Sequence, residues 1–294
     1  MTTRITVTGT GTPLATGDRA GAGVLVRYGD DVHLQFDAGR ATVTRLFGAG
    51  SSPAELSALF LTHYHSDHLV GLQDLALSHW IIDVYDTASR LPIVAPNGPT
   101  MRFCERMLEI WEDDLAVRAL HNHREPQPKI DLIGFDTPGT PTEVWSTTDV
   151  RVLAGQVRHE PIVGAVGYRI ETPDGVVAIS GDTVVCDEVA ALAVGADVVV
   201  YEAMRVDEIR KRPADKQYII EYHADTRLIG AQMAQLDVPI VMLTHLIPAP
   251  RTDAHRQAFI DEVREGGYDG EIIVCDDLDT VILDNGSITS GKQS

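Results

Sequence analysis

Residues 59–72 read LFLTHYHSDHLVGL and place three histidines and an aspartate within six positions, directly behind an apolar run. The apolar run over 57–62 predicts a short buried strand, whose end delivers the polar cluster into a loop. Imidazole nitrogens and carboxylate oxygens are ligands that suit Zn²⁺ and similar divalent ions. The cluster therefore predicts a metal site, and a histidine-rich polar loop with no ligand role is the alternative.

Two metal ions explain this crowding better than one. Adjacent Asp67 and His68 point apart in a strand or a loop, so a single ion is a poor fit for the whole cluster. His63 and His65 would bind one ion, and Asp67 and His68 would bind the second. Each ion needs more ligands, which must come from other strand ends. Three residues stand directly behind apolar strands: His159 after 150–157, Asp182 after 176–180 and His245 after 239–244.

Composition and charge limit the classes to which the protein can belong. The 294 residues are 44% hydrophobic and show no compositional break, so we expect a single domain over 1–294. The formal net charge of -19 disfavours extended binding to phosphate backbones. Three widely spaced cysteines favour a reducing compartment. Without a signal peptide or a membrane-length apolar run, a cytoplasmic location and no membrane association are expected.

Hydrophobic periodicity predicts strands and helices along the chain. The expected strands cover 4–8, 23–28, 32–36, 57–62, 130–134, 150–157, 166–171, 176–180, 197–201, 239–244, 271–275 and 279–283. The expected helices cover 40–49, 69–83, 99–120, 186–195, 225–236 and 252–265. Residues 205–216 read as a solvated loop, with a mobile lid over 205–222 as the alternative, and the tail 285–294 reads as frayed. The pattern predicts a layered α/β fold with mixed sheets and outer helices.

Several motifs together resemble the metallo-β-lactamase superfamily, most closely its ribonuclease Z and arylsulfatase-like branch. HYHSDH stands at 63–68, followed in order by His159, the SGDT aspartate Asp182 and the LTH histidine His245. The other matching motifs are GTGTP at 9–13, FDAG at 36–39, GYRIETPDG at 167–175, GADVVVYEA at 195–203 and HADT at 223–226. The resemblance covers almost the whole chain.

The resemblance implies a fold and a ligand set. The fold is a four-layer αββα sandwich of two mixed β-sheets with outer helices. The ligands are His63, His65 and His159 for the first metal, Asp67, His68 and His245 for the second, and Asp182 for both. Two divalent ions, zinc first with manganese or iron as alternatives, would generate a bridging hydroxide at neutral pH. Asp67 would also accept a proton from that water.

Two further residues take roles from the resemblance. His223 is similar to the ribonuclease Z histidine that contacts the substrate oxyanion or protonates the leaving group. A surface or capping histidine before the helix at 225–236 is the alternative. Asp37 resembles a carboxylate that orients the histidine loop and raises the basicity of its rings. The alternative is that Asp37 only makes the turn before Gly39.

The sequence favours a small substrate over transfer RNA. Ribonuclease Z carries a basic, glycine-rich arm between the residues matching His159 and Asp182, which here are too close in sequence to leave room for it. Together with the negative charge, this predicts a dinuclear metal-dependent hydrolase of a small-molecule ester: a phosphodiester, aryl sulfate, lactone or carboxylic ester. The alternatives are a ribonuclease Z-type tRNA 3′-end endonuclease and a non-hydrolytic superfamily member. Nucleic acid is not an expected partner, and a homodimer is left open.

Overall fold

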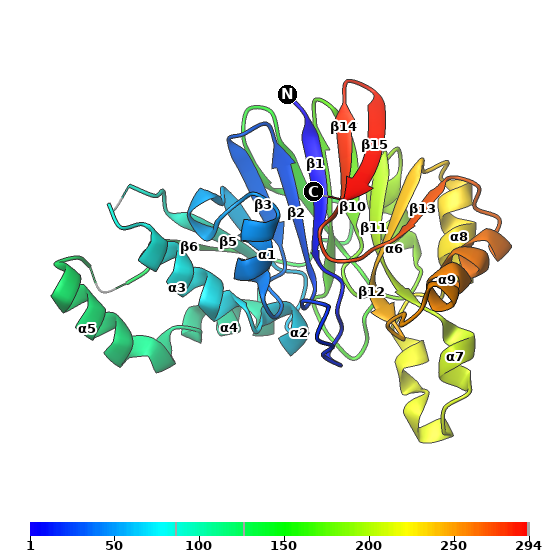
Figure 1. The fold of residues 1–294 in the computed structure, drawn as a ribbon, viewed down its shortest axis with the longest axis horizontal. Coiled ribbons are helices and arrows are strands. Elements are labelled where there is room, and N and C mark those ends of the chain that lie inside the picture. The colour runs from blue at the N-terminus through cyan, green and yellow to red at the C-terminus, as the bar shows by residue number, and fades with distance from the viewer. Residues whose placement is uncertain (86, 126, 293–294) are drawn as a thin grey trace.

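The computed structural model describes residues 1–85, 87–125 and 127–292. In these residues, two β-sheets pack face to face and helices cover both outer faces (Figure 1). The strand order of the first sheet is β15-β14-β1-β2-β3-β4-β5-β6, and that of the second is β13-β12-β11-β10-β9-β8-β7. Each sheet mixes parallel and antiparallel pairs. The structure therefore confirms the predicted αββα sandwich.

The strands are short and mostly buried at the centre of each sheet. The first sheet contains β1 Thr3–Gly9, β2 Gly23–Tyr28, β3 Val32–Phe36, β4 Ala58–Phe60, β5 Leu91–Pro96, β6 Ile130–Phe135, β14 Asp279–Asp284 and β15 Ser287–Lys292. The second contains β7 Thr142–Ser146, β8 Arg151–Gln156, β9 Val166–Thr172, β10 Gly175–Ile179, β11 Val198–Met204, β12 Ile240–Ile247 and β13 Glu271–Val274.

The helices divide between the two outer layers. Those on the side of the first sheet are α1 Thr42–Gly48, α3 Leu72–Ile82, α4 Pro99–Arg106 and α5 Glu112–Asn122, and those on the side of the second are α6 Asp187–Ala193, α8 Thr226–Gln235 and α9 Asp253–Glu265. The one-turn α2 Ser66–Leu69 lies at the rim, α7 Val206–Arg210 projects, and the 3-10 turns are η1 Pro53–Glu55, η2 Glu109–Trp111, η3 Ala214–Lys216 and η4 Tyr218–Glu221. None of the helices in the described part of the chain has both the length and the apolar character that a membrane span requires.

The central core joins the two sheets beneath the histidine loop. Phe36 of β3 and Phe60 of β4 stack with ring centroids 4.8 Å apart, and Tyr168 of β9 packs across the sandwich against both. The Tyr168 hydroxyl donates a 2.6 Å hydrogen bond to the carbonyl of Leu61. Burial of such an aromatic ring contributes about 1.5–3 kcal/mol to the free energy of folding. The hydroxyl adds no penalty because it has a hydrogen-bond partner. This contact anchors the end of β4, directly before the loop that begins with His63.

The topology brings several carboxyl strand ends to one rim. β3 runs parallel to β4, and β10 runs parallel to β11, which runs parallel to β12. β8 has the same direction as β10 because both pair antiparallel with β9. Residues that follow these strands therefore meet at one edge of the sandwich, as in other sheets whose carboxyl ends carry the site.

The structure contains three strands that the sequence patterns do not predict. β5 includes Pro92 and Pro96 and is not among the expected strands, although it pairs with strands on both sides. β7 is a largely polar edge strand. β15 pairs antiparallel with β14, so the expectation of a frayed tail is wrong for 287–292, while 293–294 lie outside the described residues.

Two further segments differ from expectation. The helix expected over 99–120 is divided into α4 and α5 by η2. Met107 packs with the core beneath α4, whereas Leu115 packs in a separate cluster with Trp80. The apolar residues before and after the break therefore pack against different parts of the protein. The solvated loop expected over 205–216 contains α7 and η3.

Candidate metal centre

Asp37 and Thr62 hold the histidine loop at the rim. Oδ1 of Asp37 accepts a 2.8 Å hydrogen bond from the backbone N–H of Thr62, and its Oδ2 lies 2.7 Å from Nδ1 of His68. The Thr62 hydroxyl lies 2.9 Å from Oδ2 of Asp37 and 2.9 Å from Nδ1 of His63. Because the Nδ1 atoms of both histidines are engaged, their Nε2 atoms are left for the centre. Asp37 therefore contacts both the start of the histidine loop and the ring of His68.

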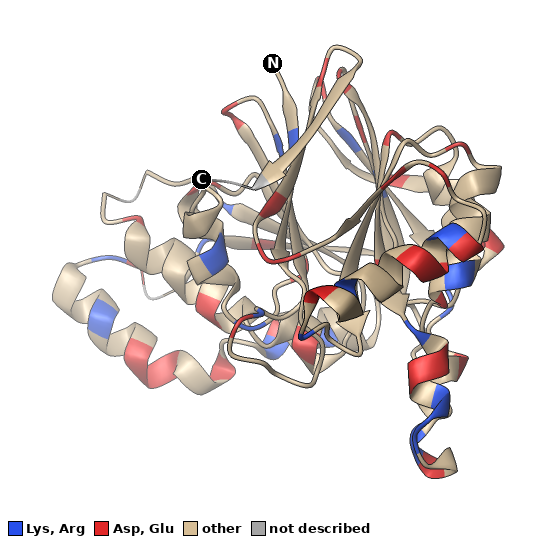
Figure 2. Cartoon of the chain, turned by 45° about the vertical axis from the view of Figure 1, so that its right-hand side comes forward, with Lys and Arg blue, Asp and Glu red and all other residues tan. Residues whose placement is uncertain are grey.

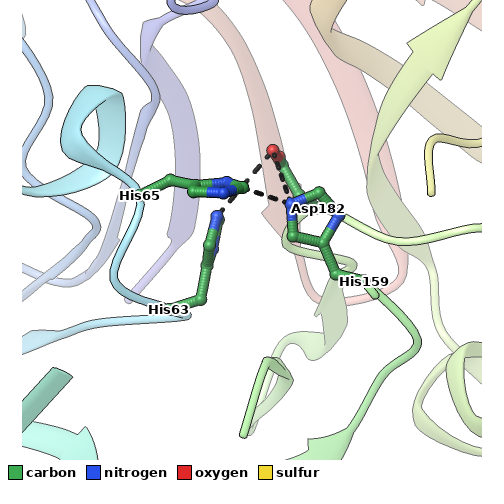
Figure 3. A group of neighbouring side chains, drawn as sticks. All are labelled: His63, His65, His159 and Asp182. Atoms are coloured by element: carbon green, nitrogen blue, oxygen red, sulfur yellow. Dashed lines mark hydrogen bonds and ion pairs between the residues drawn. The ribbon is translucent and has the colours of Figure 1, made fainter. Parts of the chain in front are cut away.

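The first ligand group contains His63, His65, His159 and Asp182 (Figure 3). One ligand atom from each lies within 4.8 Å of all the others. Nε2 of His159 is 3.1 Å from Nδ1 of His65 and 3.8 Å from Oδ2 of Asp182. His63 and His65 come from the loop after β4, while the other two follow β8 and β10, so both sheets contribute.

The second group contains Asp67, His68 and His245, again within 4.8 Å of one another. Oδ2 of Asp67 lies 3.2 Å from Nε2 of His245. Asp182 stands beside this group as well as the first, with Oδ1 3.3 Å from Nε2 of His68 and Oδ2 3.4 Å from Nε2 of His245. The structure thus brings together all seven side chains that the sequence nominates, in two groups around Asp182. A third group that could hold a metal combines Asp182 and His245 with His223.

The chemistry of these residues fits divalent cations. His63 is fully buried, and its Nε2 has no hydrogen-bond partner among the described residues; the nearest carboxylate oxygen, of Asp182, is 4.0 Å away. Buried polar atoms without a partner are rare, and a cation at this site would supply one. Burial, together with His68, holds the pKa of His63 well below its usual value, so its ring is neutral. The centre is compatible with divalent metal binding.

The charge of Asp182 is set by its neighbours. Burial would raise the pKa of this carboxyl, but His245 and His68 hold it well below its usual value. Asp182 is therefore ionised and presents two oxygens between the two histidine groups. A neutral imidazole and an ionised carboxylate are the forms in which these side chains bind a cation.

His223 lies against the second group and is fixed from behind. Its ring packs on that of His245 with centroids 5.4 Å apart, and its Nδ1 lies 2.9 Å from Oε1 of Glu202. The same oxygen accepts the backbone N–H groups of Thr183 and Ala224, at 3.0 Å and 3.2 Å. Burial lowers the pKa of His223, but the Glu202 carboxylate outweighs it and raises this pKa to about 9. The ring is held in one orientation beside the candidate ligands.

The capping alternative for His223 does not match the structure. Asp225 occupies the N-cap position of α8, and its side chain accepts the backbone N–H of Arg227 at 2.8 Å. His223 is only 8% exposed and points to Glu202 instead.

Glu202 is the residue of this site that the sequence analysis missed. It lies in β11, is 1% exposed, and holds His223 in place. The pattern that identified Asp182 and His245, a ligand-type residue at the end of an apolar strand, also applies to VVVYE and could have found it. The carbonyl of Tyr222, 2.9 Å from Nδ1 of His159, could not be found this way because any residue supplies a carbonyl.

The segment between His159 and Asp182 carries no arm. It consists of β9 and β10, an antiparallel hairpin joined by the turn around Asp174. This agrees with the spacing in the sequence, and it leaves open which other element meets a large substrate.

Comparison with known proteins identifies the family. A family model described as the beta-lactamase superfamily domain matches residues 33–246. A protein named ribonuclease Z from Mycobacterium bovis is 33% identical over 246 residues, which cover 83% of this chain and 86% of the relative. Another ribonuclease Z, from Mycolicibacterium paratuberculosis, is 32% identical over 281 residues, covering 95% and 98%.

Solved structures share the fold at lower identity. The metallo-beta-lactamase fold protein YhfI from Bacillus subtilis has a TM-score of 0.71 at 20% identity and covers 99% of this chain and 100% of its own. The short form of human tRNase Z has a TM-score of 0.68 at 19% identity, covering 94% and 98%.

The relatives overturn one prediction. The expectations of a small-molecule ester as substrate and of nucleic acid as an unlikely partner are wrong, because the curated relatives above 30% identity are named ribonuclease Z and a structural neighbour is a tRNase. The error arose because net charge is a sum over the whole surface, whereas binding depends on the field around one site. The absence of the glycine-rich arm between His159 and Asp182 likewise removes one element that could contact RNA, and it does not alter the candidate metal centre.

The predicted enzyme class and the family motifs agree with the comparisons. A metal-dependent hydrolase of ester bonds is the enzyme class expected from the sequence, and it is the class to which the ribonuclease relatives belong. The motifs first noted between 9 and 226 lie largely within the matched region. The chain belongs to the metallo-β-lactamase superfamily, in its ribonuclease Z-like branch.

Proposed function

We propose that this protein is a ribonuclease Z-type endonuclease that hydrolyses a phosphodiester bond near the 3′ end of tRNA precursors, with two divalent metal ions, zinc first. The observation that carries the proposal is the pair of ligand groups that share Asp182. The names of relatives that cover more than four fifths of the chain support RNA as the substrate. One domain spanning 1–294 would contain the whole site.

The seven side chains would divide between the two ions as the geometry groups them. His63, His65 and His159 would hold one ion, and Asp67, His68 and His245 the other, with Asp182 shared. When bound, two such cations lower the pKa of a water and offset charge on the attacking and leaving oxygens of a phosphoryl group. Manganese or iron could occupy the same imidazole and carboxylate ligands.

The residues around the ligands would position them. Asp37 and Thr62 set the ring orientation of His68 and His63 through their Nδ1 atoms. Such partners behind a metal ligand raise its basicity and exclude other ring orientations. Asp67, 2% exposed and 3.2 Å from Nε2 of His245, is the carboxylate we assign to accept a proton from the attacking water.

His223 would act on the substrate and not on a metal. Glu202 occupies its Nδ1, so its Nε2 is the atom left to donate to a phosphoryl oxygen or to the leaving oxygen. A proton held on this ring by Glu202 suits both tasks. Stacking on His245 keeps the donor next to the second ligand group.

Cleavage of a defined precursor tests this function. A tRNA transcript with a 3′ trailer is incubated with zinc- or manganese-loaded protein, and products are mapped on a sequencing gel. We expect one cut at the 3′ side of the acceptor stem, absent in Asp182→Asn. Protein that contains two equivalents of metal, hydrolyses a chromogenic phosphodiester and leaves the precursor intact would refute the RNA substrate while keeping the hydrolase.

A further inference from the structure

Residues 205–222 form a projecting hairpin at the rim that bears the metal ligands. The hairpin leaves the end of β11 and returns to His223, and β11 is the parallel neighbour of β12, which carries His245. Figure 1 shows α7 and the returning segment extending well beyond the sandwich. A substrate larger than the site itself would meet this hairpin first.

The hairpin is a built element. A small apolar cluster roots it on the rim, formed by Met204, Val206, Ile209, Ile219, Ile220 and Ile247. Arg205 at its base pairs with the buried carboxylate of Glu262 on α9 at 2.9 Å. At the turn, the Gln217 amide donates to the carbonyls of Arg210 and Arg212, at 3.0 Å and 2.7 Å. Its outer residues are therefore held in place before a ligand arrives.

The charge of the hairpin opposes that of the chain. Residues 205–222 carry five Lys or Arg against four Asp or Glu, whereas the whole chain has 24 against 43. Blue basic residues accompany the acidic ones on the projecting α7 hairpin in Figure 2. Lys211 and Lys216 have side chains 68% and 65% exposed, and their ion pairs are with acidic neighbours on the same hairpin. Exposed ion pairs of this kind are weak, so the two lysine side chains can leave their acidic neighbours and bind a phosphate.

Aromatic rings connect the hairpin to the metal ligands. Tyr218 is 58% exposed, and its ring centroid lies 6.2 Å from that of Tyr222. Tyr222 in turn lies 4.9 Å from the ring of His223 and 5.3 Å from that of His159. Unpaired bases stack on such rings regardless of their sequence, and a phosphate backbone beside them is met by basic side chains.

From these observations we propose that the 205–222 hairpin is the RNA-contact element of this protein. Tyr218 and Tyr222 stack unpaired nucleotides next to the scissile bond, and the outer basic residues bind backbone phosphates, namely Arg210, Lys211, Arg212 and Lys216. This inference rests on the proposed function, since it names the part of the chain that grips the same RNA. It supplies, on a different loop, the contact that the armless β9–β10 hairpin lacks.

Binding is measured apart from cleavage to test the hairpin. The ligand is a fluorescent tRNA precursor with a non-hydrolysable methylphosphonate at the scissile position, titrated by anisotropy against metal-loaded protein at several salt concentrations. The test variant replaces Arg210, Lys211, Arg212 and Lys216 with alanine. We expect the Kd at 0.1 M salt to rise at least about tenfold and the slope of log K against log salt to fall by about 2 to 3 units.

A control variant loses the same charge elsewhere. It replaces four exposed arginines on the other elements: Arg90, Arg106, Arg118 and Arg151. We expect its Kd to stay within about threefold of wild type. Both variants should hydrolyse bis(p-nitrophenyl) phosphate at the wild-type rate, which shows that the metal site is intact.

The stacking step has its own test. Tyr218→Ala should weaken binding about tenfold, and Tyr218→Phe should restore it because the ring is kept. If wild type cleaves the precursor while the hairpin and control variants bind alike, the hairpin inference is overturned and the proposed function stands. If wild type binds through the hairpin without cleaving, the proposed function fails alone. If wild type does not bind the RNA, both fail.

Discussion

Nδ1 of His223 lies 2.9 Å from Oε1 of Glu202, and the two side chains are 8% and 1% exposed. This contact ties the HADT segment to the end of β11 and fixes which ring nitrogen is free. The proposed function gives His223 a role on the substrate and the seven other side chains a role on the metals, so the two kinds of residue should fail differently when they are replaced.

Replacement of His223 should affect turnover without affecting metal content. In His223→Ala we expect kcat to fall about 10²- to 10³-fold, because a positioned proton donor contributes a factor of this size. Metal analysis of the purified variant should still give the wild-type stoichiometry. His255→Ala, which removes an exposed histidine on α9, is the matched control. A wild-type rate for His223→Ala would return this residue to a packing role.

Replacement of Glu202 should weaken the same step indirectly. Glu202→Gln keeps the shape but removes the charge that holds the proton on His223, so we expect a loss of about tenfold in kcat. Residues in one hydrogen-bonded unit are not additive, so the double variant with His223→Ala should be no slower than His223→Ala alone. The cycle is read from steady-state kcat values. Additive losses would show that the two residues act separately.

Replacement of the shared carboxylate should remove both metal and activity. Asp182→Ala takes away oxygens that lie 3.3 Å and 3.4 Å from ligand nitrogens of the second group, and it also opens the first. We expect less than half the wild-type metal, no measurable turnover, and an unchanged far-ultraviolet circular dichroism spectrum. Asp131→Ala, at an exposed position of β6, serves as control. Full activity in Asp182→Ala would end the dinuclear mechanism.

Replacement of Asp37 should weaken metal binding without abolishing it. Asp37 touches His68 and Thr62 and is not itself among the seven ligands, so Asp37→Ala frees the His68 ring to turn. Loss of such a supporting carboxylate typically costs about 10- to 100-fold in metal affinity. Competition with a chromophoric chelator measures this change. An unaltered affinity would show that the left-handed turn at Asp37, with φ 57°, is its only contribution.

Removal of the metals should lower thermal stability. Ions that bind only the folded chain stabilise it by about 2.7 kcal/mol for each site at 100 times the Kd. Dialysis against a chelator should therefore lower the Tm by several degrees in wild type, and readdition of zinc should restore it. Asp182→Ala should show almost no shift. Equal shifts in both proteins would place the stabilising ions elsewhere.

Most of the fold and the grouping of the seven candidate ligands could be predicted because they follow from local patterns. Alternating or continuous apolar runs mark β1, β2 and β3, and His63, His159 and Asp182 come shortly after the apolar strands β4, β8 and β10. The strands that escaped prediction lack this signal: β5 contains two prolines and β7 is largely polar. Their assignment depends on neighbours that are distant in sequence, and no local window contains that information.

The substrate could not be predicted from the same features. A charge of -19 describes the whole surface and does not show where basic residues gather; five of them lie in 205–216, a segment that reads as a solvated loop. Glu202 matches the strand-end pattern, but that pattern alone does not tell a metal ligand from a residue that orients a neighbouring side chain. Its role depends on the distance to His223, which only the folded chain defines.

The order in which the ligands occur along the chain governs when the centre can form. The loop after β4 supplies His63, His65, Asp67 and His68 early, but Asp182 and His245 belong to the other sheet and come much later. During synthesis on the ribosome, a nascent chain that ends before β12 lacks one ligand of the second ion however well its first sheet has formed. If the seven side chains bind metal as proposed, metal loading would be coupled to completion of the sandwich, and a stalled or truncated product would have an incomplete ligand set.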